Sequence, residues 1–480
     1  MKKRLVISAL GKLLLLEAVM MLPALGVSLG YGDGDTVSFL ISIGIMLAVS
    51  LPVIKFVKSD DQQMYMREGL AVAGLGWVLL SAFGALPMTV YGACDYVSAF
   101  FEITSGFTTT GATVFTEIEA LPHGILFWRS FTHWIGGMGV LVFTTALLPT
   151  IGGRGGYLAR AESPGPSFSK LAPKLGDSAK ILYLIYTILT VLQAIALLIA
   201  GMPLFDAFIH AFGTAGTGGF SNRNLSIAAY DSVAIDIIIS VFMLLFGLNF
   251  ALFFKLITRD FKGIIKNEEA RVYVGLAVIS ILLIAVDLIK VYGDFPTALR
   301  YSMFQVPTVM STTGFATADF NLWPTFSKSL MLILMLFGSC AGSTAGGLKI
   351  VRVIMLFKLA SREIRHAFQP RKVHVIKMEG KSLPEDSLSQ VGVFFFTYIV
   401  ILIFGALAVS LDGRDVVTSF TASLACLSNI GPGLGDVGPM GNFTDFSAPV
   451  KMVLSFIMLA GRLEIFPILI LFHPAAWKRS

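Results

Sequence analysis

Four short segments of the 480-residue chain combine threonine or asparagine with a following glycine, a pattern that could present oxygen atoms to a cation. When the four glycines are aligned, the twelve residues before each of them also align without a gap. Glycine permits backbone conformations with positive φ, so that successive carbonyl groups can turn toward one side. Carbonyl oxygens presented in this way can replace the hydration shell of a cation. The segments are Thr109-Thr110-Gly111, Thr217-Gly218-Gly219, Thr312-Thr313-Gly314 and Asn429-Ile430-Gly431.

The composition indicates that these segments lie in a membrane. The chain is 55% hydrophobic and 14% charged, whereas a soluble domain carries about 25% charged residues. Apolar runs of about 20 residues recur, which is the length that crosses a bilayer as a helix. The three cysteines, Cys94, Cys340 and Cys426, are scattered and the six histidines are dispersed. The sequence therefore predicts a polytopic membrane protein with neither a disulfide framework nor a zinc site.

Each glycine segment occupies the same place in a larger repeat: a long apolar helix, a short half-apolar helix, the glycine turn and a second long apolar helix. We therefore predict an all-α membrane protein with four pseudo-symmetric helix–pore-loop–helix repeats around one central pore, plus two N-terminal transmembrane helices. The predicted regions are 1–66 for the two N-terminal helices and 67–153, 177–262, 268–360 and 386–480 for the repeats. The short helices are expected at 95–108, 205–214, 296–310 and 415–427, and the inner helices at 125–149, 232–257, 329–356 and 448–472.

The distribution of charge predicts the orientation. The loops between repeats and both termini are rich in lysine and arginine, as in the basic loop with Arg154, Arg160, Lys170 and Lys174. Such an excess in short loops marks the cytoplasmic side, and it explains the net charge of +6 without a nucleic-acid partner. Two N-terminal spans and two per repeat give ten spans, an even number that places both termini in the cytoplasm. The short helices must then enter from outside and return.

The four turns are consequently expected to form a selectivity filter. Non-helical backbone is tolerated at membrane depth where it lines a water-filled path rather than lipid. The short helices direct their C-terminal ends, which carry about half a negative charge, toward this path, and acidic residues outside concentrate cations at its mouth. No catalytic set of His, Asp and Glu lies within the spans. We therefore predict a cation pathway and not an enzyme.

A glycine-rich segment from Gly338 to Lys349 interrupts the third inner helix and has two interpretations. Gly338, Gly342 and Gly346 follow a small-xxx-small spacing that favours close packing of a continuous helix. Alternatively, the accumulated cost of about 1 kcal/mol per glycine relative to alanine breaks the helix. A polar loop would then lie under the filter as a gate. The residues of this gate hypothesis are Gly338, Gly342, Ser343, Thr344, Gly346, Gly347 and Lys349.

Arg462 lies in the middle of the fourth inner helix. A charge within a membrane span is expected to face a cavity or a partner and to have a function. Glu464 is two residues away and would point to a different face of the same helix, although a partner on another helix remains an alternative. Pro467 is expected to kink the helix just after this point.

The four turns, the glycine-rich third inner helix and the arginine in the fourth resemble the Trk/Ktr/HKT superfamily of potassium transporters. The two extra N-terminal spans make the chain most similar to the membrane subunits of bacterial Trk systems. The resemblance covers essentially the whole chain and rests on the set of four turns. It implies that Gly111, Gly219, Gly314 and Gly431 are the filter glycines, and that glycine rather than serine at 111 favours potassium. The fourth turn, Asn429-Ile430-Gly431-Pro432, departs from the Thr-x-Gly-Phe pattern, so the filter should be asymmetric.

The resemblance further implies a gating loop in the third repeat and a pore-facing role for Arg462 as an electrostatic barrier. It implies potassium as the substrate with no covalent cofactor, a homodimer, and a cytoplasmic nucleotide-binding regulatory ring, TrkA, as partner. The expected location is the bacterial cytoplasmic membrane. Two alternatives remain: a symporter coupled to Na⁺ or H⁺, and a less selective pathway for K⁺ and Na⁺. Symporters usually show inverted repeats, whereas the four repeats here run in one direction.

Overall fold

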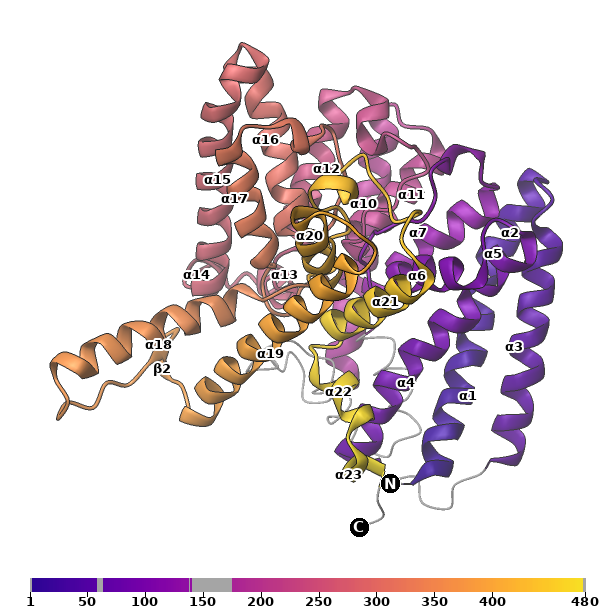
Figure 1. Ribbon diagram of the computed structural model, residues 1–480, viewed down its shortest axis with the longest axis horizontal. Helices are drawn as coiled ribbons and strands as arrows, with labels where there is room; N and C mark the ends of the chain where they lie inside the picture. Colours follow the sequence, from indigo (N-terminus) through magenta and orange to yellow (C-terminus); the bar gives the residue numbers. More distant parts are fainter. Residues whose placement is uncertain (1, 58–63, 138, 140–174, 478–480) are drawn as a thin grey trace.

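The computed structural model describes residues 2–57, 64–137, 139 and 175–477, and this part of the chain is almost entirely helical (Figure 1). The predicted first inner helix beyond residue 139 and the basic loop that contains Arg154, Arg160, Lys170 and Lys174 lie outside the described residues. The described β-strands form a small antiparallel hairpin, β1 (Lys377–Met378) and β2 (Lys381–Ser382), in which Lys377 pairs with Ser382. The prediction of an all-α membrane protein is confirmed in this coarse sense.

The N-terminal helices pack beside the first repeat. The loop after α2 is held against α7 because the Asp35 carboxylate accepts hydrogen bonds from the Ser28 hydroxyl and from the backbone N–H of Ile125, the latter at 3.2 Å. This contact fixes the N-terminal pair of helices to the inner helix of the first repeat. The helices are α1 (Lys3–Met20), α2 (Leu22–Tyr31), α3 (Thr36–Phe56), α4 (Met66–Gly84), α5 (Leu86–Tyr91) and α7 (His123–Gly137).

Four short helices precede the glycine turns, and each lies within two residues of its predicted bounds. Three begin at an aspartate whose carboxylate accepts a backbone N–H of the first turn: Asp95 from Val97, Asp294 from Thr297 and Asp415 from Thr418. Such N-caps satisfy donors that the helix itself cannot pair. The short helices are α6 (Tyr96–Phe107), α11 (Leu204–Gly216), α16 (Phe295–Met310) and α20 (Val416–Leu427).

Long apolar helices pack around the four short helices. The three outer helices of the later repeats are α10 (Leu175–Ile199), α15 (Glu268–Tyr292) and α19 (Glu385–Ser410). The inner helices of the later repeats are α12 (Val233–Phe246) with α13 (Phe250–Ile257), α17 (Thr325–Leu336), and α21 (Ala448–Arg462) with α22 (Phe466–Phe472). Short elements connect them: α14 (Phe261–Ile265), α23 (Pro474–Trp477) and the 3₁₀ turns η1 (Ile118–Ala120), η3 (Ser226–Tyr230), η4 (Phe320–Leu322) and η5 (Gly435–Val437). Helix α18 (Ile350–Phe368) extends away from the rest of the molecule (Figure 1).

The prediction of a continuous second inner helix over residues 232–257 is wrong. Helices α12 and α13 are bent by 94° at the break between them. The carbonyl of Gly247 accepts a hydrogen bond from the N–H of Cys340 at 3.0 Å, and the N–H of Phe250 donates to the carbonyl of Gly342 at 3.0 Å. The glycine-rich segment of the third repeat thus supplies partners for backbone groups that the broken helix leaves unpaired.

The third and fourth inner helices are interrupted near the positions that the sequence indicates. Residues between α17 and α18 are not helical, and Gly342 and Gly347 have φ values of 73° and 69°. The alternative of a glycine packing ridge on a continuous helix is therefore wrong. The fourth inner helix ends at Arg462 and resumes at Phe466 after Ile465, which has a φ of 68°.

Six described helices are long and apolar enough to cross a membrane, and the bent pair of α12 and α13 raises this number to seven. The predicted total of ten counts every inner helix as one span. Because the structure breaks the later three inner helices and describes the first only in part, the total of ten stays a prediction.

Candidate ion-selectivity filter

The four glycine turns adopt one backbone conformation. The residue two positions before each glycine lies in the left-handed region: Thr109, Thr217, Thr312 and Asn429 have φ values of 55°, 56°, 56° and 54°. The four glycines themselves have φ values between 77° and 92°. A left-handed threonine is rare because its branched Cβ crowds the backbone. Four repetitions of this strained geometry indicate that the turns serve one common purpose.

Hydrogen bonds explain how the turns hold this shape. At each helix end, the N–H of the residue before the glycine donates to a carbonyl five residues earlier, as in the Schellman motif that closes helix C-termini. The pairs are Thr110 to Ser105 at 2.8 Å, Gly218 to Gly213 at 2.8 Å, Thr313 to Thr308 at 2.9 Å and Ile430 to Ala425 at 2.9 Å. Each short helix therefore delivers its turn in the same register.

The turns meet one another in a closed ring. A Cβ atom added to Gly111 would lie 1.9 Å from the carbonyl oxygen of Gly218, and one added to Gly219 would lie 2.0 Å from that of Thr313. The relationship continues from Gly314 to the carbonyl of Ile430 at 2.1 Å, and from Gly431 to that of Thr110 at 2.6 Å. Each glycine thus permits the approach of the next turn in cyclic order. The structure brings all twelve predicted filter residues to this ring.

Side chains at the first position of each turn make different contacts. The Thr312 hydroxyl accepts a hydrogen bond from the N–H of Gly346 at 2.8 Å. The Asn429 amide donates to the Thr110 hydroxyl at 3.0 Å and to the carbonyl of Met458 at 2.9 Å, so it links the fourth turn to the first. The Thr109 hydroxyl has no partner among the described residues. The ring is therefore similar in backbone and asymmetric in side chains.

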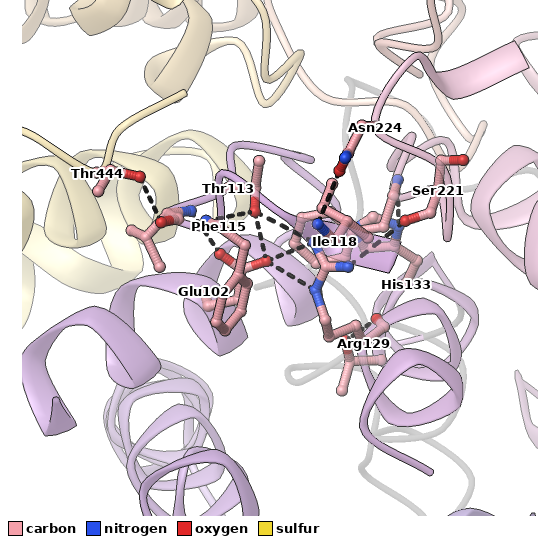
Figure 2. Close-up of polar contacts among 12 residues, drawn as sticks. Glu102, Thr113, Phe115, Ile118, Arg129, His133, Ser221, Asn224 and Thr444 are labelled. Carbon is pink, nitrogen blue, oxygen red and sulfur yellow. Dashed lines mark hydrogen bonds and ion pairs between the residues drawn. The ribbon is translucent and has the colours of Figure 1, made fainter. Parts of the chain in front are cut away.

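Behind the first turn lies a buried polar network that sequence reasoning did not single out (Figure 2). The Glu102 carboxylate accepts hydrogen bonds from the Thr113 hydroxyl at 3.0 Å and the N–H of Val114 at 2.8 Å. It also forms an ion pair with Arg129, whose Nη2 lies 2.6 Å from Oε1. Both side chains are almost fully buried, at 0% and 1% exposure. Opposite charges in two neighbouring apolar helices, Glu102 on α6 and Arg129 on α7, could have been noticed as a functional signal.

His133 on α7 lies against the second turn. Its ring stacks on Phe220 with centroids 4.2 Å apart, and its Nδ1 accepts a hydrogen bond from the N–H of Phe220 at 3.4 Å. A Cβ added to Gly218 would collide with this ring at 2.3 Å. The glycine at 218, where the other turns carry threonine or isoleucine, is therefore explained by the histidine behind it.

The glycine-rich segment passes directly against the third and fourth turns. The hydroxyl of Ser339 donates to the carbonyl of Met310 at 2.8 Å, and a Cβ on Gly346 would lie 2.6 Å from the carbonyl of Ser428. Glu269 on α15, which sequence reasoning missed, accepts hydrogen bonds from the N–H groups of Ala341 at 2.7 Å and Val351 at 3.0 Å. One carboxylate oxygen therefore connects Ala341 within the segment to Val351, two residues after its end.

The two predicted basic residues reach the same segment. Arg462 donates to the carbonyl of Thr344 at 2.5 Å and to that of Gly136 at 2.6 Å. The buried Lys349 ammonium donates to the carbonyl of Ala345. The Glu464 carboxylate pairs with Arg352 on α18. Of the remaining residues in the gate hypothesis, Ser343 donates within the segment to the carbonyl of Cys340 at 2.7 Å.

Comparison with known proteins identifies the family of this chain. Residues 37–479 match the family described as TrkH, cation transport protein. The chain belongs to the TrkH family. It is 39% identical over 471 residues to the Trk system potassium uptake protein TrkH of Salmonella typhimurium and 38% identical to that of Escherichia coli K12, with 97% of each chain covered. A crystal structure of the potassium transporter TrkH from Vibrio parahaemolyticus superposes with a TM-score of 0.89 at 35% identity and full coverage of both chains.

Membership of the TrkH family confirms the recognition made from the four turns, and it identifies the chain as a multi-pass membrane transport protein rather than an enzyme. The similarity extends over the whole chain, so the N-terminal helices belong to the same fold as the repeats.

Proposed function

We propose that this chain carries potassium ions into a bacterial cell across the cytoplasmic membrane, with the ring of four turns as its selectivity filter. The observation that supports this most directly is the cyclic approach of the four turns, each presenting a carbonyl oxygen beside the glycine of the preceding turn. Such a ring offers a dehydrated cation oxygen ligands from four sides. The relatives named above are potassium uptake proteins, which favours K⁺ as the cation.

The four short helices end at the ring, so their negative C-terminal dipoles favour a cation there. An ion that enters a negative-inside cell gains about 2.3 kcal/mol per 100 mV, so the membrane potential itself favours uptake. The basic loops place both termini in the cytoplasm under the positive-inside rule. The beginning of α1 and helix α23, the described elements next to the two termini, lie on the same side of the molecule (Figure 1), as this orientation requires.

The glycine-rich segment and Arg462 form the gate in this proposal. The segment lies against the third and fourth turns, and its contacts with Thr312, Glu269 and Arg462 keep it there. Opening would require these hydrogen bonds to be exchanged for others. We assign this exchange to a cytoplasmic nucleotide-binding ring of the TrkA kind that docks on a homodimer of the chain.

The fourth turn supports a second, less selective candidate, a pathway that passes both K⁺ and Na⁺. Ile430 and Pro432 replace the threonine and phenylalanine found at these positions of the third turn. The two candidates differ in how strongly Na⁺ competes with K⁺.

Uptake of radioactive rubidium into proteoliposomes loaded with K⁺ tests the function. We expect external K⁺ to block uptake by the wild-type protein and Na⁺ to block it weakly, and Gly111→Ser to narrow that difference. Equal competition by both ions in the wild type would favour the less selective pathway. Ion binding to the purified protein is followed as a rise in Tm with K⁺ or Na⁺. A rise in Tm without uptake indicates that the filter binds ions but the gate is closed. A protein that shows neither rubidium uptake nor K⁺-specific stabilisation would refute the proposal.

A further inference from the structure

The position nine residues before each filter glycine carries a different side chain in each repeat: Glu102, His210, Gln305 and Ala422. Three of these side chains reach the segment that follows their own turn. His210 Nε2 lies 2.9 Å from the Ser221 hydroxyl, and Gln305 donates to the carbonyl of Ala318 at 3.1 Å. Glu102 holds Thr113 and Val114. Of these four positions, the one in the first repeat carries a carboxylate.

Arg129 connects the hydrogen bonds of Glu102 behind the first turn to the second turn. Its Nε donates to Glu102 at 2.8 Å and its Nη2 to the Thr113 hydroxyl at 3.2 Å. Its Nη1 donates to the carbonyl of Ser221 at 3.5 Å, and its guanidinium lies 4.3 Å from the ring centroid of Phe220. Phe220 directly follows the filter glycine Gly219. One guanidinium thus contacts the segments that follow two neighbouring turns (Figure 2).

The two turns that this pair connects have little space between them, since Gly111 meets the carbonyl of Gly218 without room for a Cβ. Discrimination between cations depends on the positions and number of the carbonyl ligands. A fixed spacing between turns 1 and 2 therefore affects which cation fits best. A buried ion pair adds little net stability, and in some proteins such pairs specify geometry instead.

We propose that Glu102 and Arg129 are positioning residues that set the K⁺ preference of the filter by fixing turn 1 against turn 2. This inference rests on the proposed function, because it assumes that the ring is the filter. Neither side chain contacts the ion. Both act through Thr113, Val114, Phe220 and Ser221.

The test compares the full-length purified protein with Glu102→Gln, Thr113→Val and Arg129→Lys. Each substitution removes a different part of the network: the negative charge, the hydroxyl link, or the planar fork of donors that a lysine ammonium lacks. Apparent dissociation constants for K⁺ and Na⁺ are obtained from the dependence of Tm on ion concentration, which needs no open gate. In the wild type we expect K⁺ to bind more tightly than Na⁺. We expect Glu102→Gln to reduce the ratio of the Na⁺ to the K⁺ dissociation constant by about tenfold, and Thr113→Val to reduce it by less.

Asp236→Asn is the matched control. Asp236 is also a buried carboxylate paired with an arginine between two helices, since Arg300 Nε donates to it at 2.7 Å. Its described contacts include no residue of the four turns. We expect this variant to lose stability without a change in the ion ratio.

A Glu102→Gln protein that loses stability but keeps the wild-type ratio would overturn the inference and leave the proposed function intact. If Glu102→Gln does not fold, an unchanged ratio in both Thr113→Val and Arg129→Lys would overturn it equally. A wild-type protein without K⁺ preference would overturn the proposed function and the inference together.

Discussion

The backbone N–H of Gly346 donates a hydrogen bond to the hydroxyl of Thr312 at 2.8 Å, so the glycine-rich segment is tied directly to the third turn of the ring. Both residues are in the interior, and Thr312 is fully buried. The same threonine is held in the left-handed conformation that shapes the turn. A displacement of the segment is therefore coupled to the third turn by a direct hydrogen bond.

Thr312→Val should loosen this coupling. Valine keeps the shape of threonine but leaves the N–H of Gly346 without its acceptor, which costs about 1–3 kcal/mol for a buried donor. We expect faster rubidium uptake in the absence of a cytoplasmic partner. Thr104→Val on α6 is the control, because the hydroxyl of Thr104 has no partner among the described residues and Thr104 lies outside the four turns. Equal effects of the two substitutions on basal uptake would contradict this role of Thr312.

Glu269→Ala should release the glycine-rich segment at Ala341 and the start of α18 at Val351. The change leaves the N–H groups of Ala341 and Val351 unpaired, and we expect a loss of about 2–4 kcal/mol in stability. Basal uptake should rise, as in Thr312→Val. Glu268→Ala is the neighbouring control, because Glu268 pairs with Lys358 at the edge of the helix, with 25% exposure. Thermal unfolding measures the loss of stability and rubidium uptake measures the change in basal uptake. A Glu269→Ala protein with unchanged basal uptake would exclude a role of Glu269 in holding the segment closed.

Gly314→Ala should abolish uptake. The new Cβ would lie 2.1 Å from the carbonyl of Ile430, at a φ of +85°. Strain of this kind costs about 1–3 kcal/mol, and the collision would also move a proposed filter carbonyl. Gly275→Ala on α15 meets open space and should stabilise the helix by up to about 1 kcal/mol. Normal uptake in the Gly314 variant would show that the third turn is not part of the pathway.

Arg462→Ala should raise basal uptake by removing a positive charge and its bonds to Thr344 and Gly136. The released segment and the lowered electrostatic barrier act in the same direction, so we expect an increase of at least about tenfold. Arg365→Ala, on the exposed part of α18, provides the control for a simple loss of positive charge. A decrease of uptake in Arg462→Ala would instead indicate that the arginine supports the filter.

Asp33 links the turn between α2 and α3 to α7 and makes the stability of the fold depend on pH. Its carboxylate accepts hydrogen bonds from the backbone N–H of His123 at 2.9 Å and from the ring Nδ1 at 2.6 Å, which lower the pKa of Asp33 below 3.8. A carboxyl with a lowered pKa stabilises the fold above its ordinary pKa, and this contribution disappears as the pH falls through the lowered value. Asp33→Asn should remove this acid-dependent loss of Tm. The exposed Glu117→Gln should leave it in place.

The sequence alone determined the membrane class, the four turns and the bounds of the four short helices. These features depend on local signals: apolar length, aspartate caps such as Asp95 and Asp415, and the glycine that closes each turn. It also indicated the interruptions near Gly342 and Pro467, because glycine and proline weaken a helix wherever it packs.

Only the tertiary structure decided which turns are neighbours and what stands behind them. The contact of Gly111 with the carbonyl of Gly218 and the pairing of Glu102 with Arg129 join residues that are far apart in the chain. The break between α12 and α13 depends on backbone groups of the glycine-rich segment, about 90 residues away. Contacts of this kind depend on how distant segments pack in three dimensions, so a local sequence pattern does not predict them.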